Sequence, residues 1–405
     1  MTKITKDQYF KDLVNFKNNL NVPRHNWFKI KEGYSSELVK TFIDSVGVNK
    51  KEYVFDPFSG SGTTVLTSNL ENINSVGFEV NPFLHFVSKA KLINLKTFSY
   101  KNFFENANRI KIQKDDIPKL SIAEKLFQDQ LEVVVKSKKY IESLNSSPKK
   151  DLFRLAYLTS LEESSFAKKD GNGLKYPKNK IPGKFETVFM SNLERINNDL
   201  ELEVNNNLDK DIYLGNTVQM IQDSKFLNKY NQKIKLAIFS PPYVNCFDYT
   251  EVYKTELWFG NFVNDYPELK KLRESSLSSH LNKKYFSEPF SNKKLSKYLS
   301  KINLDNLWNK NIPLMINNYF FEFEIILKNI FSLMSKNGVC VIVVGNSSYD
   351  NIAIPVDEIL CDIAKKIGYV STEIKVAREL GTSSQQYKSV DNRELLRESL
   401  VILNK

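Results

Sequence analysis

The sequence predicts an α/β fold in which parallel strands alternate with helices around one central sheet. An apolar run at 53–55 is followed by a glycine-rich turn, by a helical start at 63–66 and by a second apolar run at 75–78. Strand, glycine turn, helix and strand in this order are the usual opening of a nucleotide-binding α/β sheet. Further along, 339–344 is an almost continuous apolar run rich in β-branched residues, which is typical of a parallel strand covered by helices on both faces.

Composition narrows the class of protein. The chain has 405 residues, of which 41% are hydrophobic, 14 are Gly and 13 are Pro, so it can bury a sizeable core. At about 150 residues per domain, this length predicts two to three structural units. The 58 basic and 47 acidic residues give a net charge of +11, which favours a polyanionic partner.

Cysteine, histidine and hydropathy patterns indicate what the chain is not expected to contain. Three cysteines without a CxxC pair argue against a disulfide framework, and three histidines without ligand spacing predict no metal site. The polar N-terminus predicts no signal peptide, and no apolar run approaches the roughly 18 residues of a membrane span. We therefore expect a soluble, cytoplasmic protein without a membrane partner.

The elements before residue 206 follow from local patterns. Residues 1–30 are polar with interspersed aromatic side chains and predict a short helix, and 35–46 show helical spacing after a serine cap. The strands and helix of 53–78 come next. Residues 97–205 then carry helical patterns and a basic, glycine-containing loop at 168–175, without an evident strand. We expect a mostly helical insertion at 97–205 that contributes to target recognition.

The sheet pattern resumes after this insertion, so 1–96 and 206–405 are predicted to form one catalytic domain. A second polar and basic stretch, 262–312, forms a smaller insertion within that domain. The remaining predicted elements are strands at 211–214 and 235–239, a helix at 318–335, the strand at 339–344, a helix at 355–367 and strands at 369–377 and 399–403.

The first motif is the glycine turn DPFSGSGTT at 56–64. Glycines between a strand and a helix let a ligand approach the backbone, and the helix N-terminus offers free N–H groups. The spacing matches neither a GxGxxG dinucleotide loop nor a GxxxxGK[ST] phosphate loop. A ligand with a carboxylate fits this turn better than one with phosphates.

The second and third motifs follow two further strands. Glu79 ends the second strand, roughly 20 residues beyond the glycine turn, where an acidic residue can accept hydrogen bonds from both hydroxyls of a ribose. Ser240-Pro241-Pro242-Tyr243 follows the strand at 235–239, and its prolines turn the chain at the carboxyl edge of the sheet. There a hydroxyl and a free carbonyl could accept hydrogen bonds from an amino group, while the aromatic ring could stack on a planar base.

Together, these three motifs resemble the S-adenosylmethionine-dependent amino-methyltransferases of DNA, which methylate N4 of cytosine or N6 of adenine. The resemblance covers roughly 22–96 and 208–405, with the cofactor motif first and the catalytic motif second. It implies a Rossmann-like methyltransferase fold with a seven-stranded mixed sheet and an antiparallel last strand. It also extends to 24–28 and 34–36, which are similar to the segment that closes over the cofactor's methionine, and to 215–216, similar to the strand end near its adenine. Residues 247–249 and 256–257 resemble the loop and helix after the catalytic motif. Residues 345–347 resemble the end of the fifth strand, and 397–399 the start of the last one.

The resemblance implies a role for each matching residue. Transfer from the sulfonium to nitrogen would be direct, with the target base flipped out of double-stranded DNA. Ser240, Pro241, Pro242 and Tyr243 would be catalytic. The residues implied for S-adenosylmethionine are Ser35, Ser36, Asp56, Phe58, Gly60, Gly62, Thr63, Thr64, Glu79, Asn81 and Asn216.

Target and partner follow from the same resemblance. In this family SPPY is associated mainly with N4-cytosine, so we expect cytosine-N4 methylation of DNA in a restriction-modification system, with a cognate endonuclease as a further partner. N6-adenine is the alternative, an RNA amino-methyltransferase or a silent DNA-binding protein that kept the fold are further rivals, and Cys246 is not expected to be a nucleophile. Basic side chains expected on DNA phosphates are Lys168, Lys169, Lys175, Lys283 and Lys284.

Overall fold

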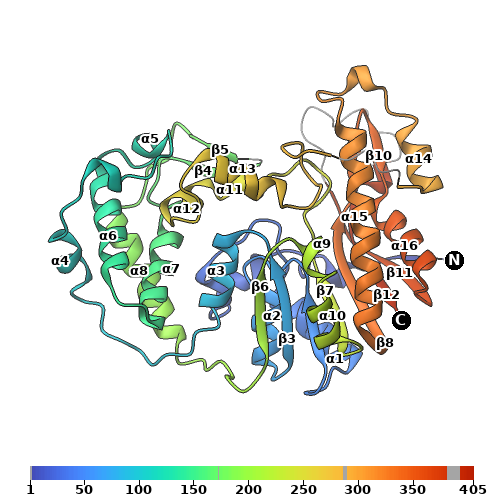
Figure 1. Cartoon of the computed structure of the whole chain (residues 1–405), viewed down its shortest axis with the longest axis horizontal. Coiled ribbons are helices and arrows are strands. Elements are labelled where there is room, and N and C mark those ends of the chain that lie inside the picture. The colour runs from blue at the N-terminus through green and yellow to red at the C-terminus, as the bar shows by residue number, and fades with distance from the viewer. Residues whose placement is uncertain (1, 172, 286–289, 381–392) are drawn as a thin grey trace.

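A central sheet of eight strands with helices on both faces forms the body of the molecule (Figure 1). The computed structural model describes residues 2–171, 173–285, 290–380 and 393–405. All neighbouring strands are parallel, except that β12 runs antiparallel to both of its neighbours. The predicted α/β fold with an antiparallel last strand is therefore confirmed. In spatial order the strands are β6 (Lys210–Leu214), β3 (Asn74–Glu79), β2 (Tyr53–Asp56), β7 (Ile234–Phe239), β8 (Met334–Gly345), β12 (Arg397–Asn404), β11 (Ser371–Glu379) and β1 (Lys3–Lys6).

The eighth strand, β1, is one more than the sequence predicted. It pairs in parallel with β11 at the sheet edge, where Lys3, Ile4 and Lys6 are exposed. An edge strand held by backbone hydrogen bonds needs no apolar alternation, so this one left no pattern to detect. Instead of a single helix, the rest of residues 1–30 forms three short 3₁₀ turns, η1 (Gln8–Phe10), η2 (Lys17–Asn21) and η3 (His25–Trp27).

Alternating side chains divide the core between the two faces of the sheet. Phe55 packs on Phe226 of α10 (Ser224–Tyr230) and belongs to the core that α15 (Ile312–Leu333) and α16 (Val356–Ile367) complete on that face. Its neighbour Val54 packs with α1 (Ser36–Val46) on the opposite face. Because both faces are covered, β8 must be apolar at successive positions, which explains its continuous run. Helix α2 (Thr63–Leu70) packs against β2, β3 and β6, and α3 (Pro82–Ala90) packs against β6 and the insertion.

Residues 97–205 lie beyond the β6 edge of the sheet as a group of helices around an aromatic core (Figure 1). The rings of Phe103, Phe153 and Phe189 meet there, with centroids of Phe103 and Phe189 4.3 Å apart. The basic loop at 168–175 is an antiparallel hairpin rather than an irregular loop. The elements are α4 (Phe103–Asn108), η4 (Lys114–Asp116), α5 (Ala123–Phe127), η5 (Gln128–Gln130), α6 (Leu131–Ser143), α7 (Pro148–Ser160), β4 (Lys168–Asp170), β5 (Gly173–Lys175) and α8 (Phe185–Asp199).

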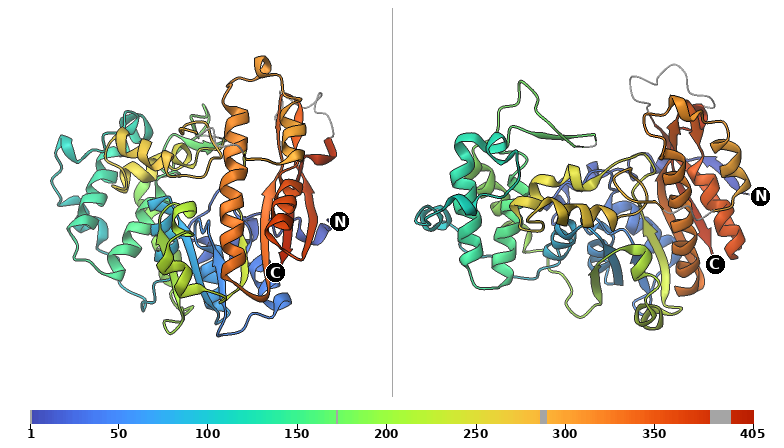
Figure 2. Two further views of the ribbon diagram at one scale, coloured as in Figure 1. Left: turned by 45° about the vertical axis from the view of Figure 1, so that its right-hand side comes forward. Right: turned by 45° about the horizontal axis from the view of Figure 1, so that its top comes forward.

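The segments after β6 and β7 cross the carboxyl edge of the sheet between this helical group and α15 (Figure 2). They are α9 (Thr217–Met220), α11 (Tyr249–Val252), α12 (Lys254–Phe259) and α13 (Tyr266–Glu274). Helix α14 (Lys293–Leu299) lies on the other side of α15, beside β10 (Ile352–Ile354) (Figure 1), and η6 (Leu304–Asn306) follows it in the chain. Strand β9 (Ser347–Tyr349) and η7 (Arg393–Leu395) come later in the chain. In the part of the chain described here, no helix is both long and apolar enough to cross a membrane. The predicted division into a catalytic domain and two insertions stays a prediction.

Candidate active site

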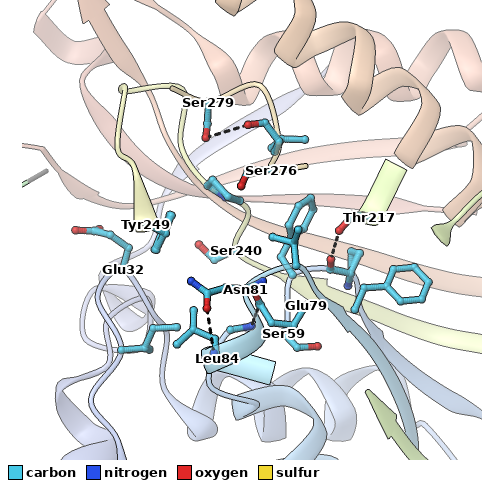
Figure 3. A pocket seen from close by; sticks show the side chains of 18 of the residues that line it. Glu32, Ser59, Glu79, Asn81, Leu84, Thr217, Ser240, Tyr249, Ser276 and Ser279 are labelled. Atoms are coloured by element: carbon cyan, nitrogen blue, oxygen red, sulfur yellow. Dashed lines mark hydrogen bonds between the residues drawn. The ribbon is translucent and has the colours of Figure 1, made fainter. Parts of the chain in front are cut away.

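The carboxyl edge of the sheet holds a cavity of about 1030 Å³, its open mouth included. Figure 3 shows its lining, with Glu79, Asn81 and Ser59 on one side, Ser240 and Tyr249 in the middle, and Ser276 and Ser279 opposite. Of the residues implied for the cofactor, the cavity is lined by Phe58, Gly60, Thr63, Glu79, Asn81 and Asn216; of the catalytic motif, it is lined by Ser240 and Pro242. The ends of β2, β3, β6 and β7 therefore contribute to one site.

The glycine turn owes its shape to two residues with positive φ. Gly60 has φ +52° and Gly62 has φ +82°, a region that other residues rarely adopt. A Cβ on Gly62 would also lie 2.8 Å from the Cβ of Ser88 in α3. Gly62 thus permits the close packing of α2 on α3. It does not line the cavity, although the sequence had implied that it contacts the cofactor.

Glu79 is fixed by the backbone of this turn. Its Oε2 accepts a hydrogen bond from Gly60 N–H at 2.7 Å, and its Oε1 accepts one from Asn81 N–H at 2.7 Å. The side chain is 7% exposed, and burial raises the pKa of this carboxyl to about 7 despite the two hydrogen bonds. A carboxylate has about four acceptor positions in all, so Glu79 can accept further hydrogen bonds from a ligand.

Two buried polar atoms beside Glu79 have no hydrogen-bond partner in the described structure. They are Asn81 Nδ2 and Ser61 Oγ, and both residues line the cavity. The Asn81 side chain is oriented by its own oxygen, which caps α3 by accepting from Phe83 N–H at 3.0 Å. Buried polar groups are rarely left unpaired, so these two atoms at the wall of the cavity are candidates for contact with a polar ligand.

Four residues implied for the cofactor lie behind the wall instead. Asp56 is buried, and its carboxylate accepts from Tyr34 O–H and Phe58 N–H, each at 2.9 Å. Thr64 contacts the same Tyr34 hydroxyl. Ser35 caps α1 by accepting from Leu38 N–H, and Ser36 donates its N–H to Asn19. These residues hold the turn and Tyr34 in place, and Tyr34 itself lines the cavity.

The catalytic motif is divided between the cavity and the core. Ser240 and Pro242 line the cavity, whereas Pro241 and Tyr243 are buried behind it. The Tyr243 ring packs so closely on β8 that a Cβ on Gly345 would lie 2.8 Å from it. Its hydroxyl donates to Glu398 at 2.7 Å, and Glu398 also accepts from Arg378 Nε at 2.5 Å. The stacking role of Tyr243 stays a prediction.

Two stretches of the lining carried no sequence signal. One is 30–33, just before Tyr34. The segment 24–28, which was expected near the cofactor, is instead bound to the end of α8: Arg24 N–H and Trp27 Nε1–H both donate to Asp199 at 2.8 Å. The other is 275–280, a serine-rich stretch after α13. Asn216 donates its side-chain N–H to the carbonyl of Ser275, which attaches this stretch to the end of β6.

Two of the lysines predicted to contact DNA form ion pairs within the protein. Lys169 is 4% exposed, and its ammonium pairs with Glu256 and Glu162 inside the protein. Lys283 is tied to Glu322 at 2.9 Å and to the carbonyl of Ser276. Lys169 cannot reach a phosphate in this arrangement, whereas Lys283 is only partly buried and its DNA contact stays a prediction. Lys168, Lys175 and Lys284 are exposed, and their DNA contacts stay predictions.

Cys246 does not have the properties of a nucleophile. Burial raises the pKa of its thiol, which disfavours the thiolate that nucleophilic attack requires. No group of three or more His, Cys, Asp or Glu side chains is arranged to hold a metal ion within the described ranges.

The sequence of this chain is similar to those of known proteins. The sequence model of a family described as DNA methylase matches residues 6–90, which include the glycine turn and Glu79. Type II methyltransferase M.BsoBI of Geobacillus stearothermophilus is 28% identical, over 98% of this chain and 89% of the relative. The chain is a relative of the DNA methylases. Type II methyltransferase M.AvaI, from Nostoc sp. and from Anabaena variabilis, is 26% identical over 97% of this chain and 89% of the relative.

Among solved structures similar to this chain is a methyltransferase that acts on rRNA. The rRNA methyltransferase aviRa of Streptomyces viridochromogenes aligns over 96% of this chain and 92% of its own, with 8% identity and a TM-score of 0.32.

Proposed function

We propose that this DNA-methylase relative transfers a methyl group from S-adenosylmethionine to the exocyclic N4 of a flipped cytosine in double-stranded DNA. The observation that carries the proposal is that Glu79 and Ser240 line one cavity from the ends of β3 and β7, which flank β2. A ribose-binding carboxylate and an acceptor for an amine are thus supplied by adjoining parts of one sheet edge.

The donor set of the cavity fits S-adenosylmethionine. Glu79 can accept from the ribose hydroxyls, and the unpaired Asn81 Nδ2 and Ser61 Oγ offer polar contacts beside it. Phe58, Leu84 and Val218 supply apolar surface suited to an adenine ring. When bound, this cofactor supplies an electrophilic methyl group on a positively charged sulfur.

Ser240 and the Pro241 carbonyl would orient the target. The Ser240 hydroxyl can accept a hydrogen bond from the exocyclic amine, which turns the nitrogen lone pair toward the methyl group. Transfer would need no covalent bond to the protein: the amine nitrogen would bond to the methyl carbon as the carbon–sulfur bond breaks, S-adenosylhomocysteine would leave, and the amine would lose one proton to water. The contribution of this chain is positioning, which can supply a large part of the barrier reduction. The base must leave the duplex to reach this depth. Tyr249 lines the cavity and is a second aromatic ring available to a flipped base.

The choice of target atom and partner rests on the resemblance. Ser240 stands where an N6-adenine enzyme usually carries an acidic or amide residue, so N4 of cytosine is the target we infer; N6 of adenine is the alternative. The names of the relatives support a place beside a cognate endonuclease in a type II restriction-modification system. The charge of +11 favours DNA or RNA over a neutral substrate.

A methyl-transfer assay tests the proposed function. The purified chain is mixed with S-adenosylmethionine carrying a labelled methyl group and with unmethylated duplex DNA, total RNA or neither. We expect label in DNA alone. Ser240→Ala should abolish most of the transfer, whereas Ser296→Ala, on the exposed face of α14, should leave it unchanged. Label in RNA alone would overturn the DNA substrate, and no label in either would overturn the function.

A further inference from the structure

His280 lies in the roof of the cavity but has no part in the function proposed so far. It is 3% exposed, lines the cavity, and follows Ser279 in the stretch 275–280. The Ser279 carbonyl accepts a hydrogen bond from Cys246 N–H at 2.9 Å. Since Cys246 is three residues beyond Tyr243, this contact brings His280 to the catalytic end of the cavity.

The hydrogen bonds of His280 fix which ring nitrogen carries the proton. Nδ1 accepts a hydrogen bond from Asn282 N–H at 3.2 Å, so Nδ1 bears a lone pair. Burial lowers the pKa of the imidazole, with Lys283 and Arg273 acting in the same direction and Asp248 opposing them. The neutral ring therefore carries its proton on Nε2.

This Nε2–H donor is unused. Nε2 is buried and has no hydrogen-bond partner in the described structure, the same condition as Asn81 Nδ2 and Ser61 Oγ near Glu79. A buried donor without an acceptor is costly, so a ligand acceptor opposite Nε2 would be stabilising. The atoms near Glu79 belong to the cofactor end, which leaves the Nε2–H of His280 for the target at the other end.

We propose that His280 is a specificity-determining residue whose Nε2–H donates to the ring nitrogen beside the exocyclic amine of the target base, N3 in cytosine. Cytosine presents a donor amine next to an acceptor nitrogen, which complements the acceptor Ser240 and the donor His280. Thymine and uracil carry N3–H at this position and would place two donors face to face. The proposal rests on the proposed function and adds to it a means of recognising the base.

Variants that keep or remove the donor test this proposal. His280→Gln retains an N–H donor on a side chain of similar reach, whereas His280→Leu removes the donor. With the site that the wild-type protein methylates, we expect kcat/KM for DNA to fall roughly 10- to 100-fold in His280→Leu and less in His280→Gln. The affinity for S-adenosylmethionine, measured by calorimetry, should stay within about twofold, as expected when cofactor and base contacts are separate. Thermal melting checks that both variants fold.

A modified substrate locates the contact. A duplex with 3-deazacytosine at the target lacks the N3 acceptor and should cost the wild-type protein about as much as the leucine substitution does. In His280→Leu the same replacement should cost little further, because the hydrogen bond is already absent. Equal costs in both proteins, an unchanged kcat/KM in His280→Leu, or a parallel loss of cofactor affinity would each overturn the proposal. If the wild-type protein methylates no base at all, the proposed function fails instead.

Discussion

The carboxyl group of Glu79 combines deep burial with two backbone hydrogen bonds, and its pKa of about 7 reflects the dominance of burial. Because this value lies above the ordinary one, ionisation of Glu79 costs the folded protein stability as pH rises toward 7, and the cost is absent below the ordinary pKa. Ribose hydroxyls would donate to the ionised form and favour it. Cofactor binding should therefore lower the pKa of Glu79 and release protons.

This linkage predicts the pH dependence of cofactor binding. The affinity for S-adenosylmethionine should weaken as pH falls below about 7, where Glu79 becomes protonated, and should level off above it. Calorimetry in buffers of different ionisation enthalpy counts the proton released. Glu79→Gln should bind about 1–3 kcal/mol more weakly with a flatter profile, while the exposed Glu201→Gln should match the wild type. A flat wild-type profile would contradict the role given to Glu79.

Two substitutions of Tyr243 distinguish a role in stacking on the target base from a role in the stability of the fold. Tyr243→Phe keeps the ring and removes the donor to Glu398, which still has Arg378, so we expect a loss of stability of about 1–2 kcal/mol with partial methyl transfer. Tyr243→Ala also leaves a cavity, at about 3–5 kcal/mol, and should lose far more transfer than cofactor affinity. Chemical denaturation and transfer rates per folded molecule measure both. Equal loss of transfer in the two variants would mean that the hydroxyl matters and the stacking prediction is wrong.

Motif residues that touch the cavity could be predicted, but their division into lining and support could not. Gly60, Glu79, Asn81 and Ser240 are at strand ends, where sequence order alone places side chains at the ligand edge. Asp56 and Thr64 belong to the same motif, yet they do not line the cavity and instead contact the hydroxyl of Tyr34, which does line it. The stretch with His280 comes from a segment after α13 whose place depends on tertiary contacts, so no local pattern reveals it.

At the scale of elements, the hairpin of β4 and β5 is fastened to the catalytic part by Lys169. Its ammonium pairs with Glu256 of α12 and with Glu162, and it lies 5.0 Å from the centre of the Tyr253 ring. Burial alone would lower the pKa of Lys169, but the two carboxylates outweigh it and the pKa is raised. The charge is thus satisfied inside the protein and ties the hairpin to the segment that follows the catalytic motif.

Removing this charge should destabilise the fold. Lys169→Met leaves Glu256 buried without its partner, and we expect a loss of about 3–5 kcal/mol in the free energy of unfolding. Lys168→Met, one residue earlier and exposed, should change stability by less than about 0.5 kcal/mol. Urea denaturation compares the two. Equal stability in both variants would contradict the structural role assigned to Lys169.

Lys168 and Lys175, the exposed lysines of the same hairpin, are still predicted to contact DNA phosphates. The double variant Lys168→Ala/Lys175→Ala should reduce the slope of log affinity against log salt by about 0.9 for each phosphate contact removed. Lys336→Ala supplies the control, because this exposed lysine lies in β8 near its amino end, away from the cavity at the carboxyl edge. Fluorescence anisotropy with duplex DNA at several salt concentrations gives the slopes. An unchanged slope in the double variant would place the hairpin away from DNA.

For the molecule as a whole, the strands of the sheet could be predicted because they alternate with glycine turns and amphipathic helices. What local patterns could not show is pairing that depends on the backbone alone, as in β1, or a hairpin as short as β4 and β5. The burial of Lys169 could not be predicted either. Whether a basic residue is exposed or buried depends on partners such as Glu256, which is 87 residues away along the chain.

Mass spectrometry of nucleosides tests the central claim most directly. Duplex DNA is treated with the protein and with S-adenosylmethionine carrying a deuterated methyl group, and is then digested to nucleosides. We predict labelled N4-methyldeoxycytidine as the product, formed by the wild-type protein and not by Ser240→Ala. Labelled N6-methyldeoxyadenosine as the only product would contradict the target atom, and 5-methyldeoxycytidine would contradict transfer to an amine oriented by Ser240.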